Sequence, residues 1–560
     1  MGKTTYALSS FKASETPSNM EPNKPEEKQE VSNFRRILPQ VLASTAKNFL
    51  LLDLGMSISI PTIVIPALRG LKNRDPNEFL EFTDVQASWF ASIAYICQPI
   101  GSVLSGIVLE PLGRKKSMIL VNIPHIIAWL MLYFAGSVTE LFIAAILLGL
   151  GVGFMEAPII TYVGEITEPS IRGIMTAAAG IAATLGFSTV FFLGTQTTWR
   201  VASLICCMVP ISTAIAIFFV PETPYWLLSK NRDKDALKSL QWLRGWVSEE
   251  AVAKEFSEMK RYSENANKCT PCQKNQVATC THKESFREKA KEMLRKRTLK
   301  PFFLVLAFFG FCQISGMHGM RPYLVQIFET FDFPIDSNWG TVVVGIMAFL
   351  ANVVCTICVK FVGKRRLSLI SMAFTCLSCL ALSFYAYKIL PPGWSSFDKH
   401  DKGAIHDLNG LNYIPMILFF TLSFATSVGI MPVPWMLVSE IFPYKTRGMA
   451  SGLVAALNYI MSFITTKTYL NLERTMSLWG TIFFYGICGV FGFIFIFMLV
   501  PETERRTLED IEVHFSDNNR KMTDRKIKKN TSFDDILNAQ SGKKGKPEAN
   551  GCDNKAFETP

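Results

Sequence analysis

Runs of about 20 apolar residues recur along the chain, and they constrain its fold more than any other feature. At a rise of about 1.5 Å per residue, a helix of that length spans the hydrocarbon core of a bilayer. Twelve such runs are separated by polar segments: 49–68, 87–109, 117–136, 140–162, 174–195, 201–220, 301–325, 339–362, 367–388, 413–439, 449–470 and 478–500. The sequence therefore predicts an all-α membrane protein with twelve transmembrane helices.

Charged residues lie mostly outside the apolar runs, and they divide the chain. A tail at 1–48, a linker block at 221–299 and a tail at 501–560 are rich in Lys and Arg and flank two apolar halves, 49–220 and 300–500. Because basic loops stay on the cytoplasmic side, we expect both termini and the linker there, with the protein in the plasma membrane. The net charge of +11 then faces an anionic leaflet of the lipid bilayer and does not indicate a nucleic acid partner. No obligatory protein partner is evident.

The two halves carry the same motifs in the same order. Each motif of the first half returns about 250 to 280 residues later, after the equivalent apolar run. The three pairs are GRKK from Gly113 with GKRR from Gly363, Glu165/Arg172 with Glu440/Arg447, and PETPYW from Pro221 with PETERR from Pro501. The repeat predicts two pseudo-symmetric six-helix halves, with a substrate site between them near the middle of the membrane.

These motifs resemble those of the sugar porter family of the major facilitator superfamily, over about residues 45–515. The resemblance rests on LEPLGRKK, YVGEITEPSIRG, PETPYWLLSKNRDKDALKSLQWLRG, QISGMHGM, GIMPVPWMLVSE and PETERRTLEDIE. Within the family, the chain looks most like the insect facilitated trehalose transporter-like branch. The resemblance implies transport of a small neutral sugar, a hexose or a disaccharide such as trehalose, by alternating access and without a cofactor.

The resemblance also implies that Gln313, Trp435 and Asn458 contact the sugar, and that His318 stands where the family has Asn. Amides both donate and accept hydrogen bonds, which matches sugar hydroxyls without charge. The Trp435 indole can stack on the apolar face of a pyranose ring. The alternative is that the two amides only bond across helices.

Several other positions depart from the family pattern. Cys312, Gly180 and Ala348 replace a Gln, a Gln and an Asn, which predicts a roomier and less polar pocket. Lys360 replaces an acid, and Ala145 replaces an Arg. The resemblance therefore implies an incomplete ion-pair network on the cytoplasmic side.

We predict facilitated diffusion without proton coupling, because the resemblance places Ser57 where proton-coupled relatives have an Asp. Asp53 and Glu156 are nevertheless embedded in apolar runs, and intramembrane carboxylates are candidates for proton coupling. The alternative for Asp53 is that it reaches cytoplasmic water from the helix end. Arg321 is expected to meet the membrane interface and not an anionic substrate.

A cytoplasmic gate is predicted where the fourth and tenth runs leave the membrane. Cross-half ion pairs of Arg172 with Glu440, and of Arg447 with Glu165, would stabilise only the outward-open state. The alternative is that each Glu pairs with the Arg of its own loop. The predicted gate residues are Arg114, Glu165, Arg172, Lys364, Glu440 and Arg447.

The linker also contains a candidate metal site with the spacing C-x2-C-x7-C-x-H. Cys269, Cys272, Cys280 and His282 could complete a tetrahedral zinc site, or the thiols could simply stay reduced. No nucleophile–base arrangement or phosphate loop is apparent, so we do not expect an enzyme. The competing functions are a proton-coupled sugar symporter and a membrane sensor that binds solute without transporting it.

Overall fold

The computed structural model describes residues 32–70, 78–266, 293–391, 393–397, 411–443 and 446–504, and positions 506, 510, 511, 514, 515 and 527. All regular secondary structure within these residues is helical. The zinc candidates Cys269, Cys272, Cys280 and His282 lie outside the described residues, so that site stays a prediction.

The first half contains six spans. They are α1 (Asn33–Ser59) with α2 (Pro61–Leu68), α3 (Asp84–Leu112), α4 (Arg114–Leu120) with α5 (Asn122–Phe134), α6 (Val138–Ile166), α7 (Pro169–Gln196) and α8 (Trp199–Phe218). Several of these helices begin at a residue that caps them. Thr83 accepts a hydrogen bond from the Gln86 amide, and Gln86 accepts one in return, a reciprocal cap that fixes the start of α3.

The second half is less regular. Its elements are α14 (Lys296–Gln313), α15 (Met317–Met320), η1 (Arg321–Tyr323), α16 (Leu324–Thr330), α17 (Ser337–Val362), α18 (Lys364–Ile389), α19 (Tyr413–Val428), α20 (Pro432–Ile441) and α21 (Arg447–Leu499). The segment from α14 to α16 bends by 48°. The helix α21 contains a non-helical residue, Ser477, with a φ of 61°, which divides it into two spans.

The described residues therefore contain twelve spans. Ten helices are long and apolar enough to cross a membrane, the bent α14–α16 segment makes an eleventh, and the division of α21 adds the twelfth. Large apolar side chains such as Phe134, Phe219 and Phe361 point outward from the bundle, as a lipid-facing surface requires. The predicted all-α fold with twelve membrane helices is confirmed.

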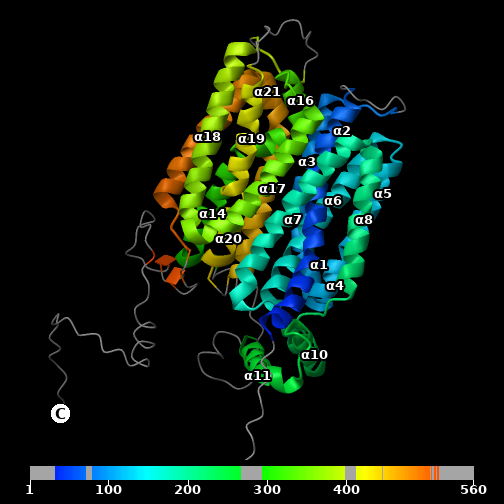
Figure 1. Cartoon of the computed structure of the whole chain (residues 1–560), viewed down its shortest axis with the longest axis vertical. Coiled ribbons are helices and arrows are strands. Elements are labelled where there is room, and N and C mark those ends of the chain that lie inside the picture. The colour runs from blue at the N-terminus through cyan, green and yellow to red at the C-terminus, as the bar shows by residue number, and fades with distance from the viewer. Residues whose placement is uncertain are drawn as a thin grey trace, which may run out of the picture.

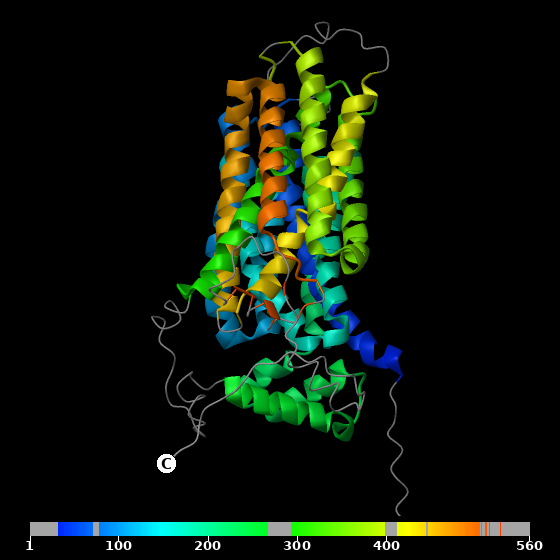
Figure 2. The same cartoon turned by 90° about the vertical axis from the view of Figure 1, so that its left-hand side faces the viewer.

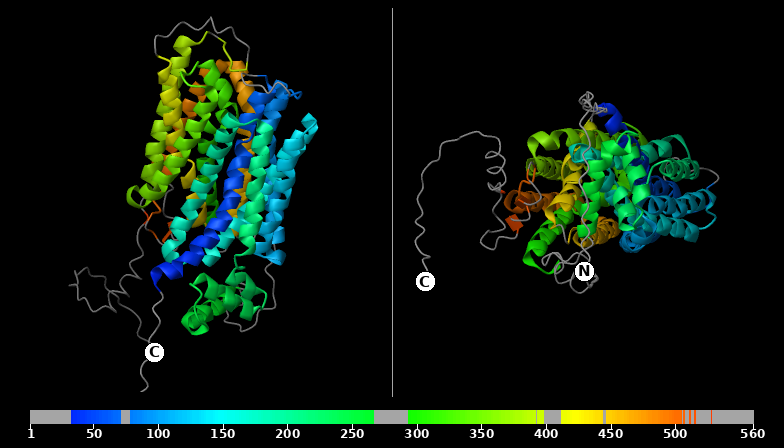
Figure 3. Two further views of the ribbon diagram at one scale, coloured as in Figure 1. Left: turned by 45° about the vertical axis from the view of Figure 1, so that its right-hand side comes forward. Right: turned by 90° about the horizontal axis from the view of Figure 1, so that it is seen from below.

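The two halves lie side by side, as the view along the bundle in Figure 3 shows. Helix α3 packs against α21, and α7 packs against α17. Three short helices, α9 (Pro224–Ser229), α10 (Asp233–Leu243) and α11 (Glu249–Ala266), lie together beneath the bundle (Figures 1 and 2). We call this end of the bundle the linker end and the opposite end the distal end.

Hydrogen bonds join the two halves at the distal end. The Thr62 hydroxyl in α2 donates to the backbone carbonyl of Arg321 in η1 at 3.1 Å. The Ser88 hydroxyl in α3 donates to the carbonyl of Lys467 in α21 at 3.1 Å. The Arg69 guanidinium donates to the carbonyl of Phe397 at 3.3 Å. These contacts hold the distal ends of the halves together.

Candidate functional site

Two of the predicted sugar contacts touch each other inside the second half. Gln313 ends α14, and its side-chain nitrogen donates a 2.7 Å hydrogen bond to the side-chain oxygen of Asn458 in α21. Both side chains are buried. The remaining oxygen of Gln313 is also buried and has no hydrogen-bond partner among the described residues. Because buried acceptors are rarely left unsatisfied, this oxygen is available to a ligand hydroxyl.

Trp435 packs against residues that neighbour this amide pair along α14 and α21. Its ring is 4.9 Å from Phe309 in an edge-on arrangement and 6.3 Å from Tyr459, the residue after Asn458. The break between α19 and α20 places Trp435 here, and the Ser371 hydroxyl accepts a hydrogen bond from the Ile430 amide freed by that break. The structure therefore brings Gln313, Asn458 and Trp435 into one cluster, which we call the amide cluster.

Glu156 lies close to Tyr459, the residue after Asn458, from the other half. The Tyr459 hydroxyl on α21 is within reach of the Glu156 carboxylate on α6. One carboxylate oxygen of Glu156 is buried with no hydrogen-bond partner among the described residues. Sequence reasoning missed Tyr459, because its partner Glu156 lies in the other half, far away in sequence.

A pocket lies between the halves on the distal side of the bend in the α14–α16 segment. Its walls come from α7, α15, η1, α17, α19 and the break before α20. The lining residues are Thr184, Phe187, Phe191, Met317, Arg321, Val344, Gly345, Ala348, Ser423, Ser427 and Met431. Gln313, Trp435 and Asn458 are not among them, so the pocket and the amide cluster are separate parts of the candidate site. We call the pocket the Arg321 pocket.

The expectation that Arg321 meets the membrane interface is wrong. Its side chain is buried, with 8% of its surface exposed, and its guanidinium lies 4.8 Å from the ring of Phe187 in the first half. The turn η1 follows the bend after α14 and carries Arg321 inward between the halves. His318 lies within electrostatic reach of Arg321, and its ring nitrogen Nδ1 is buried without a partner among the described residues.

The small residue at Gly180 does not leave an empty space beside it. A side chain at Gly180 would place its Cβ 2.9 Å from the side-chain oxygen of Asn352. Asn352 lies one helical turn after Ala348 and donates to the carbonyl of Ala348 at 3.1 Å. One amide from α17 therefore fills the space that the small residue at Gly180 leaves.

The gate motif of the first half forms one polar cluster. Arg114 pairs with Glu165 at 2.7 Å. The Glu222 carboxylate accepts hydrogen bonds from the backbone amides of Arg114 at 3.1 Å and Lys115 at 3.0 Å. Gly113, with a φ of +86°, makes the turn that lets these amides face Glu222.

The second half repeats this arrangement. Lys364 pairs with Glu440 at 2.8 Å and with Glu504 at 2.9 Å. The Glu502 carboxylate accepts from the backbone amides of Lys364 and Arg365, each at 3.1 Å. The repeat seen in the sequence is thus a repeat in three dimensions. The sequence predicts an incomplete cytoplasmic ion-pair network, because Lys360 replaces an acid and Ala145 replaces an Arg. Glu504 adds an acid to this network.

The described partners of Glu165 and Glu440 lie within their own halves. Glu165 and Glu440 each bind a basic residue of their own half, Arg114 and Lys364 respectively. Arg447 donates to the carbonyl of Phe442 at 3.3 Å. The side chain of Arg172 lies outside the described residues. Cross-half pairing stays a prediction for a state in which the linker ends of α6 and α20 meet.

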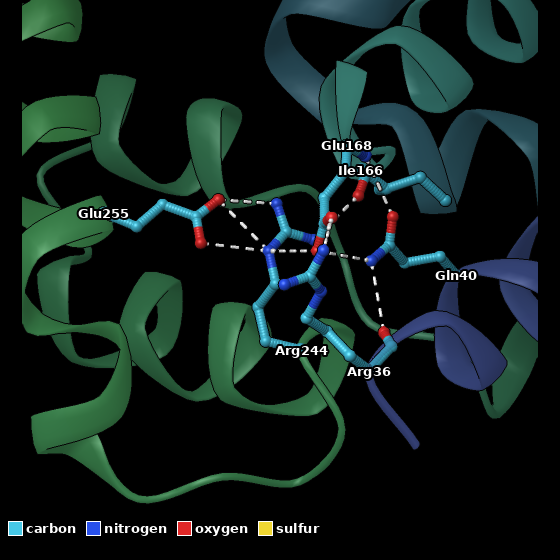
Figure 4. Close-up of polar contacts among 6 residues, drawn as sticks. All are labelled: Arg36, Gln40, Ile166, Glu168, Arg244 and Glu255. Carbon is cyan, nitrogen blue, oxygen red and sulfur yellow. Dashed lines mark hydrogen bonds and ion pairs between the residues drawn. The ribbon is translucent and has the colours of Figure 1, made fainter. Parts of the chain in front are cut away.

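A further polar cluster, unpredicted, fastens the linker helices to the first half (Figure 4). Arg244, after α10, pairs with Glu255 of α11 at 2.6 Å and donates to the carbonyl of Ile166 at 3.3 Å. Arg36 of α1 pairs with Glu168, the residue before α7, at 2.9 Å. Glu168 also lies 3.7 Å from Arg244. One network of ion pairs thus connects the linker helices to α1 through Glu168.

Asp53 is buried, so the alternative that its carboxylate reaches cytoplasmic water from the helix end is wrong. Its carboxylate is 1% exposed, accepts a hydrogen bond of 2.9 Å from the Trp129 indole and contacts the His125 ring. Both partners lie on α5. Ser57, one turn further along α1, is also buried.

Most of the chain is similar to known transporters. A family model described as "Sugar (and other) transporter" matches residues 8–515. The curated relatives include the facilitated trehalose transporters Tret1 of Culex quinquefasciatus and of Apis mellifera ligustica. The first is 29% identical over 471 residues, covering 82% of this chain and 84% of the relative. The second is 29% identical over 482 residues, covering 86% and 89%.

Solved structures share the fold. The proton:xylose symporter XylE bound to 6-bromo-6-deoxy-D-glucose aligns with a TM-score of 0.63 and 20% identity, over 86% of this chain and 99% of that chain. The inward open conformation of the xylose transporter XylE from E. coli aligns with a TM-score of 0.62 and 19% identity, over 84% and 98%. At this identity the likeness shows the fold, which is that of the major facilitator superfamily.

Proposed function

Because the chain belongs to the sugar porter family of the major facilitator superfamily, we propose that it carries a hexose or a disaccharide such as trehalose by facilitated diffusion. The observation that supports this proposal most is the amide cluster. Gln313 and Asn458 offer uncharged donors and acceptors that suit sugar hydroxyls, and Trp435 offers a flat apolar face. The curated relatives named for trehalose transport support the choice of substrate class.

Alternating access would proceed by rocking of the two halves about the site between them. The hydrogen bonds at the distal end close that side, while Glu165 and Glu440 bind partners within their own halves at the linker end. We assign this structure to a state that opens toward the linker end. Closure of the linker end would require the gate residues Arg114, Glu165, Arg172, Lys364, Glu440 and Arg447 to exchange partners.

The linker end is proposed to face the cytoplasm, and the protein to reside in the plasma membrane. Basic residues gather at this end, including Arg114, Lys115, Lys364 and Arg365, as the positive-inside rule requires. A protease-protection assay with an epitope tag at each terminus tests the orientation. Cleavage of either tag from outside intact cells would contradict it.

Facilitated diffusion is favoured over proton symport, because Ser57 stands at the coupling position and Asp53 is engaged with Trp129 and His125. The symport alternative rests on Glu156, a buried carboxylate that contacts the site from the first half.

The test is uptake of radiolabelled sugars in a transport-deficient cell, with and without a protonophore. We expect uptake that the protonophore leaves unchanged. Sugar-induced alkalinisation of the medium that Glu156→Gln or Asp53→Asn abolishes would establish symport instead.

A further inference from the structure

Arg321 is a cation inside the protein for which the described residues provide no anion. Its guanidinium lies 4.8 Å from the ring of Phe187 and 4.0 Å from the sulfur of Met431, and it forms no ion pair with a described residue. The titratable groups within its electrostatic reach are the Tyr95 hydroxyl, the Cys312 thiol and the His318 imidazole, none of which is a carboxylate.

This arrangement is unusual for a buried charge. Buried cations are normally paired with an acid, because removing a guanidinium from water costs more than contact with an aromatic ring returns. Even Arg114, whose side chain is only partly buried, follows that rule through its ion pair with Glu165. Arg321 is buried, yet no acid stands among the described residues that line the Arg321 pocket with it.

The other polar groups of the pocket do not replace an acid. The hydroxyls of Thr184 and Ser423 donate to the backbone carbonyls of Gly180 at 3.0 Å and Val344 at 2.9 Å. The protons of Thr184 and Ser423 are therefore engaged, and the guanidinium is the one charged group among the described residues that line the pocket. A guanidinium prefers the two oxygens of a carboxylate, which it binds through parallel hydrogen bonds.

We propose that Arg321 forms an anion subsite of the transport site, and that the preferred solute is a sugar acid whose carboxylate binds this guanidinium. The inference rests on the proposed sugar transport and adds a charged group to the substrate, in place of the neutral sugar that the sequence predicts. Phe187 and Phe191 supply apolar surface beside the subsite, and Cys312 connects it along the chain to Gln313 of the amide cluster. One cation matches the single charge of a carboxylate better than the double charge of a phosphate.

The experiment compares two solutes that differ only in the acid group. Purified wild-type protein is reconstituted in vesicles in methanesulfonate buffer, and uptake of glucuronate and glucose is measured. We expect glucuronate to be preferred at least about ten-fold, since charge-assisted bonds are the stronger ones. Arg321→Gln removes that preference, and Arg321→Lys retains part of it.

The matched control is Lys467→Gln. Lys467 is also a cation over an aromatic ring at the contact between the halves, 4.1 Å from Trp89, but it does not line the Arg321 pocket. Its neutralisation leaves the preference for glucuronate unchanged. Thermal unfolding of each purified variant in detergent verifies that it is folded, and stabilisation by each solute reports binding without transport.

The outcomes separate this inference from the proposed function. If glucose is transported but glucuronate is not preferred, or if Arg321→Gln leaves the preference intact, the sugar-acid subsite is wrong and sugar transport stands. If neither solute is transported but glucuronate stabilises the wild type and not Arg321→Gln, the subsite stands and transport fails. If glucuronate is neither transported nor stabilises the wild type, the subsite is wrong; the same result for glucose and trehalose contradicts the proposed function.

Two further arms identify the anion. If chloride raises the affinity of the wild type for glucose, and Arg321→Gln abolishes that effect, the occupant is an inorganic ion and the proposal is wrong. If glucose 6-phosphate is preferred to glucuronate, the assignment to a carboxylate is wrong.

Discussion

Gln313 donates a 2.7 Å hydrogen bond to Asn458, and this bond joins the end of α14 to the part of α21 that precedes Ser477. This hydrogen bond lies just before the bend that carries Arg321 inward. The amide cluster and the Arg321 pocket therefore lie on either side of that bend. A solute that bound the free oxygen of Gln313 would contact both α14 and, through Asn458, α21. Substrate binding can thereby act on the packing of the second half.

Replacing Asn458 by Leu is expected to raise the KM for sugar about ten-fold, because it leaves the Gln313 amide unpaired in a buried site, at a cost of about 1–3 kcal/mol. The control is Gln326→Leu, which removes a buried amide whose side-chain atoms have no hydrogen-bond partner among the described residues. Uptake kinetics at matched surface expression are the measurement. An equal KM in Asn458→Leu and Gln326→Leu would remove Asn458 from the site.

Trp435→Ala is expected to weaken sugar affinity about five-fold while the protein stays folded, since ring contacts of this kind are worth about 1 kcal/mol. Trp435→Phe keeps an aromatic face next to Phe309 and loses much less. Competition by unlabelled sugar in the uptake assay measures both variants. Affinity that is unchanged in Trp435→Ala would show that the indole only packs the core.

Charge reversal at the gate tests the cross-half pairs. Glu440→Arg is expected to reduce transport, and adding Arg172→Glu to restore part of it, because opposite charges again meet when the linker ends close. Each pair is partly solvated and worth about 1 kcal/mol, so rescue will be partial.

Pairing within one half is the competing explanation, since Glu440 pairs with Lys364 in the structure. Lys364→Glu combined with Glu440→Lys restores that local pair without restoring any cross-half pair. If this double variant recovers transport while Arg172→Glu with Glu440→Arg is no better than its worse single variant, pairing within each half is the relevant contact. Surface expression is measured for every variant.

Gly113 and Gly363 are expected to be intolerant of Ala. Each has a left-handed φ, and a Cβ would lie 2.4 Å from an oxygen of Glu222 or 2.5 Å from one of Glu502. We expect each substitution to cost more than about 1 kcal/mol and to lower the thermal midpoint of the purified protein. Gly106→Ala is the control, because that helical glycine has open space around it. Equal midpoints for Gly113→Ala and Gly106→Ala would contradict the role of the turn.

The membrane spans were predictable because hydropathy and helix length report the same constraint, burial of about 20 residues in lipid. The ends of these spans were less predictable. The first run was placed at 49–68, yet α1 begins at Asn33, because a helix continues into water where hydropathy gives no signal. The duplicated GRKK and PET motifs predicted equivalent positions, and the carboxylate–amide contacts of Glu222 and Glu502 explain why those residues recur.

The candidate site was predictable only where a family motif marks it. Gln313, Trp435 and Asn458 come together as the motifs implied, whereas Arg321 was misplaced, because a straight helix would have carried it to the membrane surface. Gly316, with a φ of +100°, lies in the break after α14 that redirects the segment. Tyr459 and Asn352 were missed because their partners, Glu156 and Gly180, lie in the other half, far away in sequence.

Counterflow in proteoliposomes tests the central claim, that this chain moves a sugar by alternating access, most directly. Vesicles loaded with unlabelled sugar are diluted into a trace of the same labelled sugar, with trehalose, glucose and glucuronate as separate arms and no pH gradient. The account predicts transient accumulation of label in at least one arm, slowed by Asn458→Leu. Binding detected by thermal stabilisation, with no accumulation of label in any arm, would contradict it and identify the protein as a sensor.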